Sequence, residues 1–503
     1  MDAAVARIQK AIKNQEKILI YGDYDVDGVT ASTVIEQSLI FAGVKPDSVT
    51  IMLPDRLADG YGMSPKLIKK AQTIGATLII TVDCGSRNHE IIDELNHLSI
   101  DTIITDHHET DQTIPDAVAV INPHRKDQPT TSLQNLAGVG VAFKVAEALT
   151  QQNLIQAGQE KWLLDLVLIG TICDNMTLTG ENRILGFYGL KVLEKTRRPG
   201  LRELMKVSGV KSLTSEAIGF QIGPRLNAAG RLETADLSLN LLRTKSPAEA
   251  ATLVAKLEEL NKKRKHEQLS ATREIEKRGI GSDPVIIEAG NWHEGILGIV
   301  AGRLVEEYHK PAFVLTNTTE EILKGSGRSF GDFNLADALT YAKDSIINGG
   351  GHAAAAGVKI YQKDLYRFRE QINEYYRSLK LTNQDQFLKA KPDLNIENLS
   401  DFSLDLIDDL KSLEPYGAGN EEPLFLLKNV EVLENRKMGS EGQHLRLDIR
   451  GRDGKILKLV AFFAPDNWLN IEPGETLDIT MKVVENEWNG TRSLEGRIID
   501  IVL

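Results

Sequence analysis

Residues 17–28 read KILIYGDYDVDG, an apolar run that turns into three alternating aspartates just before the helical stretch GVTASTVIEQSLIFAG. Two later stretches, ATLIITVDCG and IDTIITDHHE, repeat the order of an apolar run followed by acidic residues. Nearly continuous apolar runs are typical of strands that are buried on both faces of a parallel sheet. In such sheets, the loops at the carboxyl ends of the strands carry the functional groups. The first 190 residues therefore predict an α/β fold with a parallel sheet.

The DYDVDG motif places Asp23, Asp25 and Asp27 at alternate positions. Three carboxylates so close together repel one another strongly unless a cation lies among them. An EF-hand loop is one alternative, but it needs a glutamate six residues after Gly28, where this chain has Val34. Taken alone, the motif favours a solvated acidic turn that caps a helix beginning at Gly28.

Further acids and imidazoles follow the later apolar runs. Asp83 ends one run, the sequence Asp106-His107-His108 ends the next, and Asp174 follows the run LVLIGTIC. Because the carboxyl ends of parallel strands meet at one edge of a sheet, we expect these groups to surround a common site. A lone histidine pair would more often be structural, but the acidic segments around it favour metal binding. Carboxylates with an imidazole suit Mn²⁺ or Mg²⁺ better than a structural zinc, and the set could hold two ions.

The two cysteines of the chain, Cys84 and Cys173, each adjoin a predicted ligand. Neighbours in a strand point to opposite faces, so we expect Cys84 to turn away from the site, and we interpret both as small buried hydrophobic residues. They cannot form a disulfide framework, and the first residues contain no apolar run of the secretory kind. No stretch approaches the roughly 18 apolar residues of a membrane span. We therefore expect a cytoplasmic protein with no membrane partner.

The length of 503 residues exceeds what one hydrophobic core usually organises, so two to four domains are expected. A hydrophobic content of 42% and a charged content of 26% exclude a collagen-like or largely disordered chain. We predict a parallel-sheet domain over residues 1–190 and a helical connector over 191–280, ending in a long polar helix. A smaller α/β domain follows over 281–384, in which GGGHAAAAG opens a helix. Five short strands predict a β-barrel within 385–503.

Charge is unevenly distributed along the chain. Residues 191–280 contain 19 Lys and Arg against 11 Asp and Glu, a net charge of +8, whereas the whole chain has a net charge of −12. A basic segment in an acidic protein indicates a polyanionic partner. The alternative, a solvated helical face, is favoured by charge alone.

The motifs DYDVDG, VDCG, TDHHE and CDNM resemble, in this order, the four motifs of the DHH phosphoesterase superfamily. Downstream, IGPRLNAAGRL, NWHEGILGIVAGRLVEEYHKPAFVL, GSGRSFGDFNLADAL and GGGHAAAAG are similar to the RecJ-like single-strand-specific exonucleases of that superfamily, as are LPDRLADGYG and LEPYGAGNEEPLF. The resemblance covers nearly the whole chain. It implies a DHH domain, a long connecting helix, a DHH-associated domain that closes the substrate cleft, and a C-terminal OB-like barrel that binds single strands.

The resemblance also implies a centre of two Mn²⁺ ions, with Mg²⁺ as the alternative, and a set of site residues. The implied metal ligands are Asp25, Asp27, Asp83, His107 and Asp174, with Asp83 as the bridge, and the further catalytic residues are Asp23, Asp106 and His108. His108 is expected to contact the scissile phosphate rather than a metal. Superfamily members often carry a histidine where this chain has Tyr21, so Asp23 or water would complete the first ligand set.

Residues that could bind substrate phosphates occur in the downstream motifs. The candidates are Arg56, Arg225, Arg231, Arg303, Ser326, Arg328, Gly350, Gly351 and His352. Guanidinium groups bind phosphates bidentately, and glycine N–H groups at a helix start can do the same. For any single arginine, an ion pair with an acid is the alternative. For the Gly/Ala segment, the residues alone favour tight helix packing.

The expected function is metal-dependent hydrolysis of single-stranded DNA from the 5′ end to mononucleotides, in DNA repair and recombination. A helicase and a single-strand-binding protein are possible partners. One alternative is a DHH-type phosphodiesterase that acts on oligoribonucleotides or cyclic dinucleotides. Another is a non-catalytic replication scaffold, although such proteins lose metal ligands and this chain keeps all four acidic motifs.

Overall fold

The computed structural model describes residues 1–503 except residues 320, 382–389, 440–441, 489–490 and 503. The chain divides into two compact units. Unit 1 comprises Met1–Leu381 with Gly417–Gly419, and unit 2 comprises Thr382–Tyr416 with Asn420–Leu503. The predicted borders at residues 190 and 280 both fall inside unit 1 and remain predictions.

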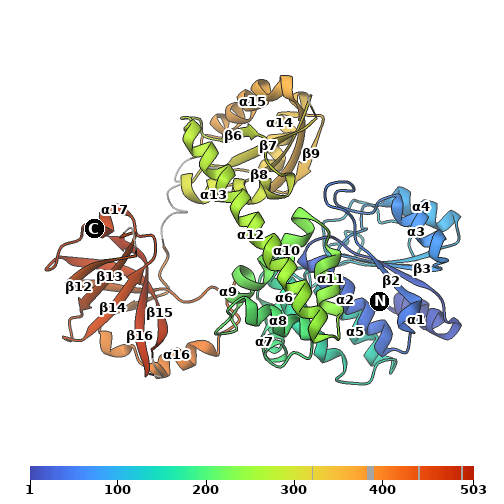
Figure 1. Ribbon diagram of the computed structural model, residues 1–503, viewed down its shortest axis with the longest axis horizontal. Helices are drawn as coiled ribbons and strands as arrows, with labels where there is room; N and C mark the ends of the chain where they lie inside the picture. The colour runs from blue at the N-terminus through green and yellow to red at the C-terminus, as the bar shows by residue number, and fades with distance from the viewer. Residues whose placement is uncertain (320, 382–389, 440–441, 489–490, 503) are drawn as a thin grey trace. The chain divides into compact units, whose positions relative to one another are not determined.

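Unit 1 begins with the predicted parallel sheet (Figure 1). Its strands are β1 (Ile18–Tyr21), β2 (Val49–Met52), β3 (Leu78–Val82), β4 (Asp101–Thr105) and β5 (Ala119–Ile121). They lie in the order β2-β1-β3-β4-β5, and every pairing is parallel. The three strands predicted from apolar runs occupy the centre of the sheet, which confirms the α/β class. The short outer strands β2 and β5 were not predicted, because their sequences lack a long apolar run.

Helices cover both faces of this sheet. They are α1 (Asp2–Asn14), α2 (Val26–Phe41), α3 (Lys66–Ile74), α4 (His89–His97), α5 (Gly138–Gln151) and α6 (Leu164–Cys173). Helices α2, α5 and α6 share a core with Ile18, Ile20 and Ile80 of the sheet. The alternate residues, among them Leu19 and Ile79, pack with α3 and α4 on the other face. Successive residues of these strands are thus buried on opposite faces of the sheet, which explains why the central strands are apolar throughout.

The apolar run before Asp174 forms helix α6 and not a strand, which corrects our placement of Asp174 at a strand end. Residues 164–171 are all buried, so this helix is apolar around its whole circumference. A ten-residue apolar run of this kind carries no periodicity that separates a buried helix from a buried strand. Asp174 is the C-cap of α6.

Residues 180–278 are helical in most places, as predicted. The helices are α7 (Gly180–Glu194), α8 (Pro199–Val207), α9 (Ser215–Ala217), α10 (Gly223–Leu232), α11 (Asp236–Arg243) and α12 (Pro247–Arg278), with a π-helix at Ile218–Ile222. Helix α12 is the long polar helix. Its first half packs Val254 and Leu257 into the core of α2 and α5, and its second half packs Ala271 and Ile275 against α13.

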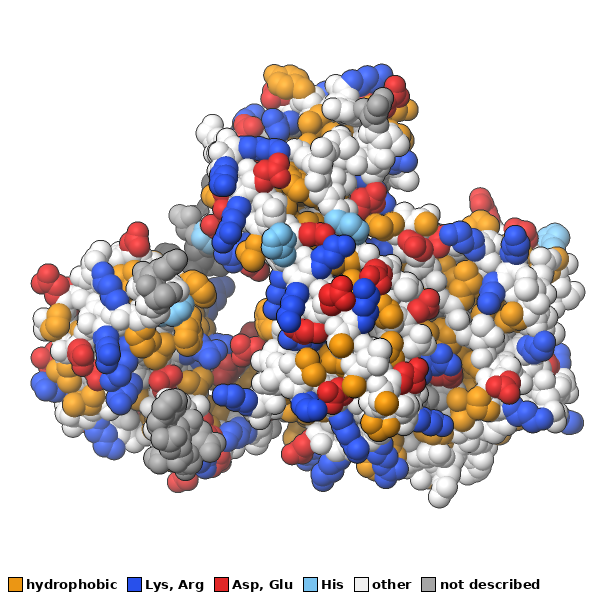
Figure 2. Space-filling view, in the orientation of Figure 1, with side chains coloured by type: hydrophobic (Ala, Val, Ile, Leu, Met, Phe, Trp, Pro, Cys, Tyr) orange, Lys and Arg blue, Asp and Glu red, His pale blue; other side chains and the backbone are white. Residues whose placement is uncertain are grey.

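The basic segment does not form a continuous basic surface on the visible face of unit 1. Figure 2 shows Lys and Arg side chains interspersed there with Asp and Glu. On α12 itself, Lys256 lies 3.7 Å from Glu259, and Lys262 lies 4.0 Å from Glu258. These contacts support the solvated-face interpretation for this helix.

The second sheet of unit 1 is mixed. Its strands are β6 (Ile286–Gly290), β7 (Ala312–Thr319), β8 (Ile322–Arg328), β9 (Asn348–Gly351) and β10 (Ala355–Tyr361), and its helices are α13 (Leu297–Tyr308), α14 (Leu335–Tyr341) and α15 (Leu365–Ser378). The strand order is β6-β7-β8-β10-β9, with only β6 and β7 parallel. Helix α13 packs on one face, and α14 and α15 pack on the other.

The segment GGGHAAAAG does not open a helix, which corrects our prediction. Its glycines form the edge strand β9, and its last alanines begin β10 in a hairpin closed by the hydrogen bond from His352 N–H to Ala355 O. The β10 sequence alternates buried Ala356, Val358 and Ile360 with exposed residues, which is the period of a strand. The alanines suggested helix propensity, but the two-residue alternation that follows them overrides it.

Unit 2 is the predicted five-stranded barrel with additions. Its elements are β11 (Leu394–Ile396), α16 (Leu404–Lys411), β12 (Phe425–Met438), β13 (His444–Arg450), β14 (Ile456–Ala461), α17 (Asp466–Leu469), β15 (Thr476–Trp488) and β16 (Thr491–Val502). The sheet runs β11-β12-β13-β14-β16-β15, and the pairing of β12 with β15 closes it. Among the described residues, no helix combines the length and apolar character that crossing a membrane requires.

The close packing of α8 on α11 predicts a stability effect. A Cβ at Gly200 would lie 2.0 Å from the carbonyl oxygen of Leu241, so Gly200→Ala must push two helices apart. We expect a loss of about 1–3 kcal/mol in the free energy of unfolding, measured by urea denaturation. Gly302→Ala in α13 is the control, because open space surrounds that position and alanine favours a helix. Equal midpoints for the two variants would contradict the packing.

Candidate active site

The first acidic motif links β1 to α2. Asp25 is the N-cap of α2, and its carboxylate accepts a hydrogen bond of 3.1 Å from Gly28 N–H. The helix therefore begins at Val26, two residues earlier than predicted. Asp23 and Asp27 are buried, so the motif is not a solvated turn.

The carboxylate of Asp27 lies at the start of α5. It accepts hydrogen bonds of 2.6 Å from Gly138 N–H and 2.8 Å from Val139 N–H. The positive end of a helix favours a negative charge there. Gly138 is required for a second reason, because a Cβ at this position would lie 2.6 Å from Asp83 Oδ1. The sequence analysis missed Gly138 and Val139 as donors to Asp27, although the sequence LAGVGVAF places two glycines at the start of an apolar helix.

Asp83 follows β3 in a left-handed backbone conformation with φ of 61°. Its N–H donates to Thr105 O at 2.9 Å, which anchors the turn to β4. A left-handed conformation is rare for a residue other than glycine and is held here by its surroundings. The next residue, Cys84, is buried in the core on the α3 and α4 side of the sheet, as predicted. Cys173 packs against the core but is only partly buried and lines a cavity, which corrects our interpretation of it as a buried residue.

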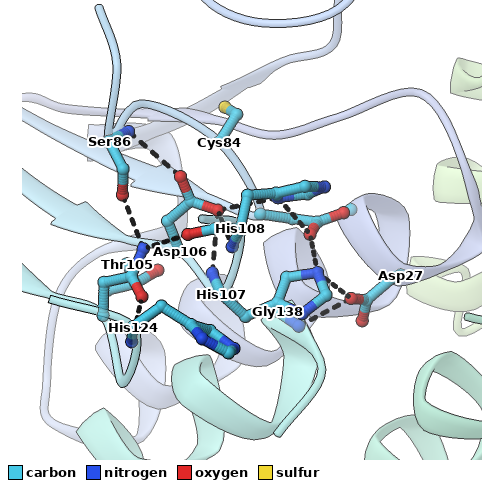
Figure 3. A network of polar contacts seen from close by, with 12 residues as sticks. Asp27, Cys84, Ser86, Thr105, Asp106, His107, His108, His124 and Gly138 are labelled. Atoms are coloured by element: carbon cyan, nitrogen blue, oxygen red, sulfur yellow. Dashed lines mark hydrogen bonds and ion pairs between the residues drawn. The ribbon is translucent and has the colours of Figure 1, made fainter. Parts of the chain in front are cut away.

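Asp106 organises the two histidines (Figure 3). Its carboxylate accepts hydrogen bonds from the N–H groups of Ser86, His107 and His108, and lies 2.9 Å from His108 Nδ1. Burial disfavours its charge, but these bonds outweigh burial and lower the pKa of Asp106. Burial also opposes the charge of His108, yet the bond to Asp106 and the nearby carboxylates raise the pKa of His108 to about 9. Asp106 therefore fixes the orientation and the charge of His108.

His107 points into the acidic cluster. Its Nε2 lies 3.0 Å from Asp83 Oδ1, 3.5 Å from Asp174 Oδ2 and 3.7 Å from Asp27 Oδ2. Burial and the positive charge of His108 lower the pKa of His107 to about 3, so the ring is neutral at pH 7. A neutral imidazole is the form that ligates a metal.

Among the residues that the structure describes, three overlapping groups of side chains have metal-ligating atoms within 4.8 Å of one another. They are Asp83 with His107 and His108, Asp27 with His107 and Asp174, and Asp23 with Asp25 and Asp83. Asp83 and His107 each belong to two of the groups, and the bridging role of Asp83 remains a prediction. Tyr21 does not join them, because it is buried in the core and its hydroxyl donates to Gly62 O at 3.0 Å.

The acids of this cluster are poorly compensated by the protein. Burial and then the charge of Asp25 raise the pKa of Asp27 to about 7, and burial and then the charge of Asp27 raise the pKa of Asp174 to about 8. The same causes raise the pKa values of Asp23 and Asp83. Asp23 Oδ1 is buried and accepts no hydrogen bond among the described residues. This set of side chains is rich in oxygen atoms, its negative charges are not compensated, and it includes a neutral imidazole. It therefore fits divalent cations.

Three of the predicted phosphate-binding arginines lie near one another. Burial and the positive charges of Arg56, Arg264 and Arg328 lower the pKa of Arg231 to about 9. Burial and the charge of Arg56 also lower the pKa of Arg328. Arg56 lies over the Tyr24 ring, 4.9 Å from its centroid, beside the acidic motif. Within the described part of the chain, none of these four arginines has a carboxylate within ion-pair distance. We missed Arg264, which stands in the charged sequence KKRK of α12.

The other candidates are distributed differently. Arg225 pairs with Glu258 at 2.6 Å, and Arg303 is half-exposed and lies 3.4 Å from Glu307 on its own helix. Ser326 and Arg328 are two residues apart in β8, so their side chains face the same side of that strand. A cavity of about 380 Å³ is lined by Gly350, Gly351 and His352, at the end of β9. Its other lining residues include Tyr61, Arg87, Asn88 and His108. The Tyr61 ring also lies against the ring of His108, with the centroids 4.9 Å apart and the planes tilted by 52°.

Acids follow β1, β3 and β4 of the parallel sheet and the end of α6, and the same unit contains a second α/β module; this arrangement is that of a phosphoesterase of the DHH type. Family models match in the same order along the chain. The DHH family, N-terminal domain, matches residues 17–171, the DHHA1 domain matches 282–378, and the RecJ OB domain matches 393–500.

Curated relatives extend the match to the whole length. A single-stranded-DNA-specific exonuclease RecJ from Salmonella typhimurium is 33% identical, with 100% of this chain and 90% of the relative covered. The RecJ of Bacillus subtilis is 36% identical over 99% of this chain, which spans 63% of that relative. The crystal structure of Thermus thermophilus RecJ with Mn²⁺ superimposes with a TM-score of 0.84 at 29% identity, over 99% of this chain and 71% of that one. The chain belongs to the RecJ family.

The raised pKa values predict how the metal-free protein responds to pH. The folded cluster binds protons more tightly than the unfolded chain, whose aspartates titrate near pH 3.9. Between about pH 4 and 8 the folded state therefore holds more protons, and its stability falls as pH rises. Asp83→Asn removes one of the repelling charges. We expect it to raise the melting temperature in EDTA at pH 8 by several degrees, and by less at pH 5.

The matched control is Asp106→Asn, the same substitution at a carboxylate whose pKa is lowered. Its charge stabilises the fold above about pH 4, so its loss should lower the melting temperature at pH 8. Differential scanning calorimetry of both variants at the two pH values makes the comparison. Shifts of the same sign at pH 8 would contradict the electrostatic description of the site.

Proposed function

We propose that this protein is a metal-dependent exonuclease that hydrolyses single-stranded DNA from the 5′ end and releases mononucleotides. The observation that carries the proposal is the presence, in one unit, of an uncompensated acidic cluster and a group of arginines without acidic partners. Both sets suit phosphodiester hydrolysis, because the acidic cluster attracts divalent cations and the arginines attract phosphates. The names of the relatives support the substrate class.

For the metal site we propose Asp25, Asp27, Asp83, His107 and Asp174 as ligands, with Asp23 in support. Two bound divalent cations would neutralise phosphate oxygens, acidify a water and stabilise the leaving oxygen. The left-handed turn of Asp83 and the N–H groups of Gly138 and Val139 hold two of these carboxylates in fixed positions. We propose Mn²⁺ as the preferred ion, with Mg²⁺ as a weaker substitute.

The protein's own groups orient the substrate. Protonated His108, held by Asp106, presents a positive N–H donor beside the acidic cluster and suits an oxygen of the scissile phosphate. Arg56, Arg231 and Arg328 form an anion-attracting surface whose charges repel one another until a phosphate is bound. A terminal 5′ phosphate carries an additional charge and a third free oxygen, which this surface can distinguish from an internal phosphate.

We further propose a role in DNA repair and recombination and a location in the cytoplasm. A helicase that exposes single strands, or a single-strand-binding protein, would be its partner.

End-labelled single strands of both polarities test the proposal, with Mn²⁺, with Mg²⁺ and with chelator. We expect 5′ mononucleotide release that needs the metal. Faster hydrolysis of a dinucleotide RNA or a cyclic dinucleotide than of a 30-nucleotide DNA would favour the phosphodiesterase alternative, and no hydrolysis of any substrate would favour the scaffold.

Arg328 and Arg303 provide a matched pair for end recognition. Arg328→Ala removes a cation from the unpaired group, so we expect the KM for 5′-phosphorylated strands to rise by about tenfold, with a smaller change for 5′-hydroxyl strands. Arg303→Ala removes an arginine that already contacts two acids of its own helix, and we expect less than a twofold change. Steady-state kinetics on both strand types measures the difference. An unchanged phosphate preference in Arg328→Ala would place end recognition elsewhere.

A further inference from the structure

One cavity of unit 1 combines basic and apolar side chains. It has a volume of about 260 Å³. Its charged lining residues are Arg197, Arg198, Arg243, Lys245 and the carboxylate Asp165. All four cations belong to the basic segment 191–280, whose charge indicated an anionic partner. The cavity therefore gathers part of that charge at one place in the fold.

Two of these arginines are held by acids. Arg198 donates a hydrogen bond of 3.2 Å to Asp165 and one of 3.0 Å to Gln37 Oε1. Arg243 donates a hydrogen bond of 2.8 Å to Glu36. These contacts build the wall of the cavity, and they neutralise the one acid that the lining contains.

Arg197 and Lys245 are the cations that remain for a ligand. In the part of the chain that the structure describes, neither has a carboxylate within ion-pair distance. The guanidinium carbon of Arg197 lies 3.6 Å from the centroid of the Trp162 ring. Such a contact fixes the orientation of an arginine and leaves its positive charge in place. Because both side chains are also exposed to solvent, they can bind an anion that enters the cavity.

The rest of the lining suits an aromatic group. Trp162, Phe41 and Leu242 provide apolar surface, and Gln37 and Gln159 provide carboxamides. Small-molecule sites are typically apolar cavities in which a few polar groups orient the ligand. The volume lies near the lower end of their range, about 300 Å³, which suits a single nucleotide better than a strand.

The cavity is remote from the acidic cluster. Helix α2 begins after Asp25 in the cluster and contributes Gln37 and Phe41 to the cavity. Helix α6 ends before Asp174 in the cluster and contributes Asp165. At about 1.5 Å per residue, the two sites lie about 13–18 Å apart along these helices. A ligand in the cavity would therefore not occupy the metal cluster.

We propose that this cavity binds a nucleoside monophosphate, with its phosphate against Arg197 and Lys245 and its base against Trp162 and Phe41. The inference goes beyond the proposed function, because binding here needs neither metal nor hydrolysis. The ligand class includes the mononucleotides that the proposed exonuclease would release. Inorganic phosphate and an acidic peptide share the negative charge of this ligand, but both lack the base.

Isothermal titration calorimetry of the full chain in EDTA tests the site, with deoxyadenosine monophosphate (dAMP) as the probe. We expect dAMP to bind the wild type, and its dissociation constant to rise about tenfold in Arg197→Ala and in Lys245→Ala, because each removes a charged contact with the phosphate. Lys206→Ala is the matched control, since Lys206 is an exposed lysine of α8 that does not line the cavity. The melting temperatures of the variants show whether they are folded.

Arg328→Ala alters the proposed substrate site and should bind dAMP as the wild type does. The inference is overturned if the wild type binds no dAMP at millimolar concentration, or if Arg197→Ala and Lys245→Ala keep the wild-type constant. It is also overturned if inorganic phosphate or a hexaglutamate peptide binds as tightly as dAMP. Failure of the proposed function is a separate result, in which dAMP binds in EDTA but no strand is hydrolysed with Mn²⁺.

Discussion

Mutual repulsion among buried carboxylates is the constraint on which the architecture of unit 1 depends. Asp23, Asp27 and Asp83 are almost fully buried, and no arginine or lysine forms an ion pair with them in the described part of the chain. The fold holds them with backbone contacts, through the N-terminus of α5 and the left-handed turn after β3. Bound divalent cations would compensate this repulsion, and in the metal-free protein the charged cluster costs stability.

A complementary imbalance occurs among the arginines. Burial and the charges of Arg56, Arg264 and Arg328 lower the pKa of Arg231, and burial and the charge of Arg56 lower the pKa of Arg328. In the described part of the chain, none of these four arginines pairs with an acid. If each arginine had formed an ion pair with an aspartate, neither set would attract a ligand. Under the proposed function, the separation of the two charges within one unit would leave cations to be bound by one set and phosphates by the other, as a phosphodiester substrate requires.

The sequence predicted the features that depend on local pattern. Apolar runs identified β1, β3 and β4, and the acids that follow them identified most of the cluster, because parallel strand ends must meet. Features that depend on tertiary context were missed. The run that forms α6 has no periodicity that would distinguish a helix from a strand. The hairpin β9–β10 was missed because its alanines favour a helix. Contacts such as Gly138 N–H with Asp27, 111 residues apart in the chain, could not be derived from either segment alone.

The central claim is that the buried acids of unit 1 are a binding site for two divalent cations. Anomalous X-ray scattering from crystals of the full chain grown with Mn²⁺ tests it most directly. We expect two anomalous peaks within ligand distance of the cluster, one beside Asp27, His107 and Asp174 and one beside Asp25, with Asp83 contacting both. Crystals saturated with Mn²⁺ that show no peak among these carboxylates would contradict the account.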